Sequence, residues 1–67
     1  MEEEVLKETY NKILKRYYNG CNYIEEHIEE IDNYLPVVKE LLSRINKILE
    51  KIPNVTEEEI LNGFKIK

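Results

Sequence analysis

The only histidine, His27, is the first candidate for chemistry because it lies among four carboxylates, those of Glu25, Glu26, Glu29 and Glu30. Carboxylate-bridged metal sites in helical bundles use several Glu residues and Glu-x-x-His pairs from facing helices. This sequence offers a single His-x-x-Glu in the reverse order, too few ligands unless copies assemble around it. We therefore predict no metal site and interpret the segment as a solvated acidic helix face, with a pH-responsive contact as the alternative.

The single cysteine, Cys21, is the only thiol that could act as a nucleophile. Such a role requires a base close in space, and His27 is six residues further on and points to another side of a helix. The sequence contains no Gly-rich phosphate loop and no serine-nucleophile motif. We predict that Cys21 is a small buried apolar residue, and that the protein is not an enzyme and has neither catalytic residues nor a cofactor.

Two charged clusters could bind or imitate nucleic acid. Lys12, Lys15 and Arg16 form the basic cluster, but the formal net charge of −4 disfavours attraction to phosphate. The acidic run from Glu25 to Asp32 could instead imitate the phosphates themselves. We therefore expect no nucleic-acid partner, and we keep as the alternative function an acidic phage or mobile-element inhibitor that binds a host protein as a nucleic-acid mimic.

The composition fits one small helical domain over residues 1–67. A single Cys excludes an internal disulfide and is typical of a reducing compartment. The sequence has no apolar run long enough to span a membrane, and its first residues are acidic where a signal peptide would be basic. We expect a cytoplasmic protein that does not enter the membrane.

A long stripe of apolar residues determines the first helix. Its members are separated by steps of three and four residues, with a mean of about 3.6, the period of an α-helix. The spacing predicts a helix over residues 3–33. The stripe consists of Leu6, Tyr10, Ile13, Tyr17, Cys21, Ile24, Ile28, Ile31 and Leu35.

The sequence Asn19-Gly20-Cys21-Asn22 could interrupt this helix. Asn-Gly is a turn signal, and Asn22 with Glu25 resembles a capping box. The apolar stripe keeps its phase across the junction, however, and one Gly costs a helix only about 1 kcal/mol relative to Ala. We predict a continuous helix in which Gly20 lets another helix approach closely. The alternative is a monomeric three-helix bundle broken at Asn19-Gly20.

Two further helices follow. Cap-type residues before Pro36 predict a tight turn over residues 32–36, and a second, antiparallel helix over residues 36–51. The apolar residues of that helix cover about 140° of its surface, so it should contact more than one neighbour. Thr56 and Glu59 form a capping box that predicts a third helix over residues 57–62, with Gly63 at its end and Phe64 in the core.

The predicted fold is therefore all-α: a helical hairpin with a long first helix, plus a short C-terminal helix. The second helix would cover only the C-terminal half of the first and leave an apolar surface exposed. Such a surface indicates an interaction site, and a two-fold homodimer is the simplest way to cover it. The predicted interface comprises Leu6, Tyr10, Ile13, Leu14 and Tyr17.

A second row along the first helix consists of Tyr23, His27, Glu30 and Tyr34. It is either covered by a helix of the same assembly or is a flank that recognises another protein, since Tyr is enriched at interface hot spots. We therefore predict a non-enzymatic helical protein–protein interaction module that acts as a homodimer and binds a further protein.

Overall fold

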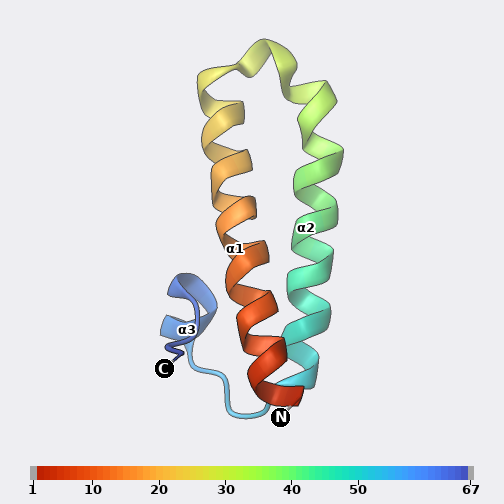
Figure 1. Cartoon of the computed structure of the whole chain (residues 1–67). Coiled ribbons are helices and arrows are strands. Elements are labelled where there is room, and N and C mark those ends of the chain that lie inside the picture. Colours follow the sequence, from red (N-terminus) through yellow and green to blue (C-terminus); the bar gives the residue numbers. More distant parts are fainter. Residues whose placement is uncertain (1, 67) are drawn as a thin grey trace.

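The computed structural model describes residues 2–66 and consists of helices joined by short connections. The helices are α1 (Glu2–Glu26), the 3-10 turn η1 (Ile28–Glu30), α2 (Ile31–Lys51) and α3 (Glu57–Asn62). Helices α1 and α2 form an antiparallel hairpin, and α3 lies beside α1 (Figure 1). No strand occurs within residues 2–66. The predicted all-α fold is confirmed.

Helix α1 continues through Gly20, as predicted, so the alternative of a break at Asn19-Gly20 is wrong. The glycine faces α2. A Cβ placed on Gly20 would lie 3.0 Å from Cγ2 of Val38, closer than side chains normally approach. The missing side chain therefore allows the close contact between α1 and α2 that the sequence suggested.

The turn lies earlier than predicted, over residues 27–30 rather than 32–36. His27 leaves the helical conformation with φ −130° and ψ 63°, and the Glu30 N–H donates to the His27 carbonyl at 2.9 Å to close η1. The predicted first helix to residue 33 and second helix from residue 36 are therefore wrong at this junction. The apolar stripe misled because its spacing continues through the turn, although two of its members there, Ile28 and Leu35, are exposed.

Pro36 lies inside α2, at its sixth residue, rather than at the start of a helix. It has no N–H to donate to the carbonyl of Asp32, and its ring crowds that carbonyl. We expect Pro36→Ala to raise the free energy of unfolding by about 1–3 kcal/mol, measured by thermal unfolding followed by circular dichroism. Pro53→Ala, in the connector after α2, is the control and should give no such gain. A lower melting temperature for Pro36→Ala would contradict this position of the proline.

The core lies at the open end of the hairpin, away from the turn. It combines side chains of α1 with those from the C-terminal part of α2, the residue after it and the chain's C-terminal segment. Tyr10 is completely buried. The buried cluster consists of Tyr10, Ile13, Leu14, Ile45, Ile52 and Phe64.

Helix α3 has the predicted bounds and the predicted caps. The Glu59 N–H donates to Oγ1 of Thr56 at 3.2 Å, and the Thr56 N–H donates to Oε1 of Glu59 at 3.0 Å. The helix ends at Asn62 and is followed by the cap residue Gly63, whose φ of +93° is a conformation that favours glycine. Phe64 is buried, also as predicted.

Three polar side chains of α1 hold the C-terminal segment in place. The hydroxyls of Tyr10 and Tyr18 each donate, at 2.6 Å, to the carbonyls of Ile60 and Leu61 respectively. Asn11 binds both backbone groups of Phe64: its Nδ2 donates to the carbonyl at 2.8 Å, and its Oδ1 accepts from the N–H at 2.7 Å. These contacts satisfy carbonyls that the last turn of α3 cannot pair internally.

The expectation that the N-terminal half of the first helix is left uncovered is wrong. Tyr10, Ile13 and Leu14 are buried inside a single copy, and Leu6 and Tyr17 pack partly buried against the same core. The physical reason is the early turn: α2 has 21 residues against the 25 of α1, so it reaches nearly to the start of α1, and the C-terminal segment covers another side. The predicted dimer interface was based on an exposed apolar surface at these five residues, and the structure does not have that surface.

The contacts of Asn11 predict a specific loss of stability. Asn11→Ala leaves the N–H and the carbonyl of Phe64 without partners, which should cost about 1–3 kcal/mol and speed hydrogen exchange at the Phe64 amide. Asn19→Ala, on an exposed part of the same helix, is the matched control and should change stability by less than about 0.5 kcal/mol. Equal effects of the two substitutions would show that Asn11 does not hold the segment.

Candidate interaction surface

Helix α2 carries apolar side chains at three positions of a seven-residue repeat. The first series is buried against α1 and the second is partly buried there. The third series lies about 60° round the helix from the first, at 100° per residue; we call it the leucine row. The first series is Val38, Ile45 and Ile52, the second is Leu41 and Ile48, and the leucine row is Leu35, Leu42 and Leu49.

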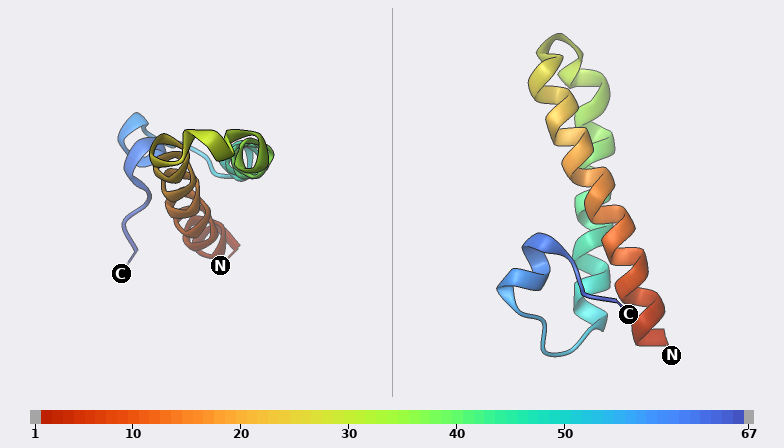
Figure 2. Two further views of the ribbon diagram at one scale, coloured as in Figure 1. Left: turned by 90° about the horizontal axis from the view of Figure 1, so that it is seen from above. Right: turned by 60° about the vertical axis from the view of Figure 1, so that its left-hand side comes forward.

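The leucine row is spaced like a core but is only partly covered. Leu35 is 37% exposed and Leu42 is 41% exposed, whereas Leu49 packs partly buried against the core. Apolar residues at three positions of the repeat are typical of a helix that packs into a wide core. Helix α2 packs against α1 and η1 (Figure 2), whereas the side-chain hydrogen bonds that hold the backbone of α3 come from α1. The remaining helix within residues 2–66, α3, has only six residues, so the described part of the chain supplies no second long helix for α2.

The predicted partner flank comes together at the turn, although its residues do not form a row on one helix. Tyr23 is at the centre: its ring stacks on His27 with centroids 4.1 Å apart and packs against Tyr34 at 4.6 Å. The Tyr23 hydroxyl donates to Oε1 of Glu30 at 3.3 Å. These four side chains come from α1, the connector, η1 and α2, so they stabilise the turn. Recognition of another protein by this flank stays a prediction.

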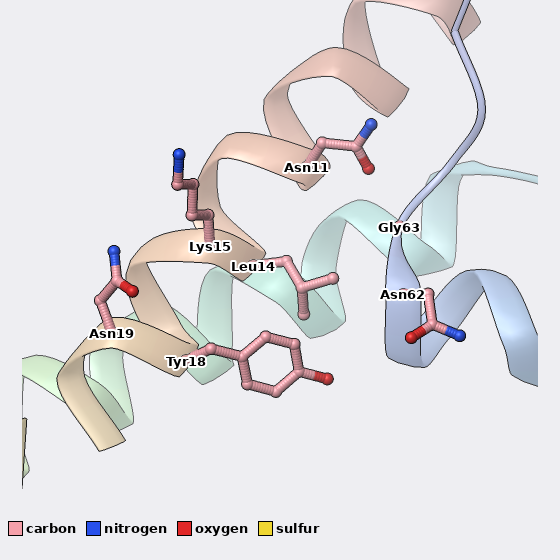
Figure 3. A pocket seen from close by; sticks show the side chains of 7 residues that line it. All are labelled: Asn11, Leu14, Lys15, Tyr18, Asn19, Asn62 and Gly63. Carbon is pink, nitrogen blue, oxygen red and sulfur yellow. The ribbon is translucent and has the colours of Figure 1, made fainter. Parts of the chain in front are cut away.

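A groove separates α1 from the end of α3 (Figure 3), with a volume of about 330 Å³. Its floor is the buried Leu14, and the Asn11 amide and Tyr18 hydroxyl that line it are already bonded to the C-terminal backbone. A Cβ on Gly63 would lie 2.7 Å from Oδ1 of Asn11, so only glycine fits at this approach. The groove therefore results from the docking of the C-terminal segment on α1. Lys15, Asn19 and Asn62 complete its lining.

Sequence reasoning missed Asn11 and Tyr18 as structural residues. The available signal was their spacing: with Leu14 between them they form a second row, in steps of three and four, beside the main apolar stripe. Because this row mixes an amide, a leucine and a tyrosine, it is not recognised as an apolar stripe. Its partner is also 43–53 residues away along the chain.

Charge is separated along the hairpin. Five carboxylates lie at the turn end, and no Lys or Arg occurs between Arg16 and Lys39. The turn divides these carboxylates among α1, η1 and α2, so they form a cluster rather than one helical row. Within residues 2–66 the ion pairs are Lys7–Glu3 and Arg44–Glu40, which leaves the five acids and the basic cluster of α1 unpaired. The acids are Glu25, Glu26, Glu29, Glu30 and Asp32.

Other candidate chemistry is sparse in the described part of the chain. No group of three metal-ligating side chains comes together within residues 2–66. Cys21 is a free, partly buried thiol on the apolar stripe, and Nδ1 of His27 lies 3.2 Å from the carbonyl of Tyr23. None of the helices described is both long enough and apolar enough to cross a membrane.

Comparison with protein-family models, with curated proteins and with solved structures finds no match to this chain.

The environment of Tyr23 holds its proton tightly. The contact with the Tyr34 hydroxyl, followed by burial and the negative charge of Glu30, raises the pKa of Tyr23 to about 12. An ionised Tyr23 could no longer donate to Glu30 and would be repelled by it. The contacts of Tyr23 at the turn therefore favour the protonated hydroxyl.

The raised pKa predicts a loss of stability at alkaline pH. The folded chain binds this proton more tightly than the unfolded chain, where the tyrosine pKa is about 10. The stabilisation is therefore complete below pH 10 and is lost as the pH rises to about 12. Titration of the tyrosine Cζ resonances by NMR should show Tyr23 ionising at about pH 12, and earlier in Tyr34→Phe. Ionisation of Tyr23 at its ordinary pH in the native chain would contradict the cluster.

Proposed function

We propose that this chain is a non-enzymatic helical module that acts by binding another polypeptide chain through the outer face of α2. The observation that carries the proposal is the leucine row, which has the spacing and side chains of a helix core, while Leu35 and Leu42 have no second helix to contact within residues 2–66. Polar residues would serve equally well at Leu35 and Leu42 if the hairpin functioned alone, because both are more than a third exposed.

The size of the core also supports a partner. A 67-residue chain buries only about 60% of the surface that it exposes when unfolded, and the buried cluster here occupies one end of the hairpin. Small domains without disulfides or metals often gain stability by association. A partner that binds only the folded state would stabilise this hairpin by mass action.

An acidic inhibitor of phage or mobile-element origin, which binds a host protein through the turn end, is the second candidate. The observation in its favour is the cluster of five carboxylates, which has no cation within hydrogen-bonding reach in residues 2–66. Since the turn gathers these groups at one end, they suit a compact basic patch on a host protein better than they imitate an extended row of phosphates.

Photo-crosslinking in the native cells tests the proposal and separates the two candidates. A benzophenone side chain is introduced at Leu42, at Glu29 for the acidic turn end, and at Glu40 as a control, since Glu40 is exposed and lies about 160° round α2 from Leu42. We expect protein adducts from position 42 and none above background from position 40. Adducts from position 29 alone would favour the inhibitor, and absence of adducts from positions 42 and 29 would refute both.

A further inference from the structure

We infer that the partner of the leucine row is a second copy of this chain, packed antiparallel so that a two-fold axis passes near Leu42. This inference rests on the proposed function and names its partner. It keeps the predicted homodimer but moves its interface from the buried stripe of α1 to the exposed flank of α2.

The exposed area of one copy matches what a dimer would bury. The chain exposes 5391 Å², whereas a compact monomer of its 8.1 kDa mass is expected to expose about 4500 Å². The excess of about 900 Å² per copy is close to the roughly 800 Å² that each partner buries in a standard interface. The excess arises from the extended shape of 41 × 18 × 18 Å, which places much of α2 in contact with solvent.

The spacing of the row makes it complementary to itself. Leu35 and Leu49 lie seven residues on either side of Leu42. When two copies of α2 run antiparallel about Leu42, that residue meets its own copy, and Leu35 of each copy meets Leu49 of the other. Such an interface uses the same patch on both copies and closes as a dimer.

The separation of charge selects the antiparallel orientation. A parallel pairing would bring two acidic turn ends together, each with five carboxylates and no Lys or Arg. The antiparallel pairing instead places Asp32 level with Ile52 of the second copy, next to Lys51 of that copy and within two turns of its Lys47. Exposed ion pairs add little affinity, but they discriminate between orientations.

Nothing else in residues 2–66 competes for this face. The C-terminal segment is bonded instead to α1, through Tyr10, Asn11 and Tyr18. Two copies can therefore meet along α2 without displacing any contact seen within one copy.

The mass of the purified chain gives the first test. Light scattering coupled to size exclusion should give twice 8.1 kDa for the native chain and 8.1 kDa for Leu42→Glu. Leu61→Glu is the matched control, since Leu61 is 58% exposed on α3, and it should remain dimeric. Circular dichroism confirms that both variants keep their helices. A native chain that is monomeric at millimolar concentration overturns the inference.

Cysteine crosslinking in a Cys21→Ser background tests the orientation. Leu42→Cys should form a disulfide with its own copy, whereas Leu35→Cys should crosslink only when mixed with Leu49→Cys. A disulfide of Leu35→Cys with itself would show a parallel dimer and overturn the arrangement. If the chain is monomeric but position 42 still crosslinks to a different protein in cells, this inference fails while the proposed function stands.

Discussion

The docking of the C-terminal segment onto α1 is the interaction on which the rest of the structure depends. A six-residue helix such as α3 is far too short to be stable alone. Its position is set by the two tyrosine hydroxyls that bind its carbonyls and by the Asn11 amide that binds Phe64 just after it. Asn11 and Tyr18 lie about 160–180° round α1 from Gly20, which faces α2, so the segment that they bind adds to another side of α1. Docking of the segment on α1 closes the core around Tyr10 and Phe64. It leaves the outer face of α2 exposed to solvent.

This arrangement gives the hairpin two unequal halves. At the open end, α1, α2 and the C-terminal segment share one buried cluster, which contains nearly all of the buried side chains. The turn end has only the two helices, with Val38 buried against Gly20 and the aromatic cluster of Tyr23 in place of an aliphatic core. Exposed apolar side chains are consequently numerous from Ile28 to Leu42. Both proposed surfaces, the leucine row and the acidic turn, depend on this thin half.

Local signals were sufficient for much of the fold. The periodic stripe gave the continuity of α1 through Gly20, and the Thr56 capping box gave the bounds of α3, because each depends on residues within one turn of the helix. The turn was misplaced since Pro36 is a strong local signal that packing overrides. The hydrogen bonds of Asn11 and Tyr18 could not be foreseen, because they join side chains to backbone groups more than 40 residues away. As a result the exposed apolar surface was predicted on the first helix, whereas the structure has it on α2. The sequence showed the wide apolar arc of α2, but it did not show which residues hold the C-terminal segment on α1.

The most direct test of this account is the position of Phe64 in solution, measured by nuclear Overhauser effects in the native chain. The rings of Phe64 and Tyr10 have centroids 5.2 Å apart, so strong effects between their protons are expected, with none between Phe64 and the methyl groups of Leu42. Effects from Phe64 to Leu42 would place the C-terminal segment on the outer face of α2. The leucine row would then be part of the core of a single copy, and the case for a partner would fail.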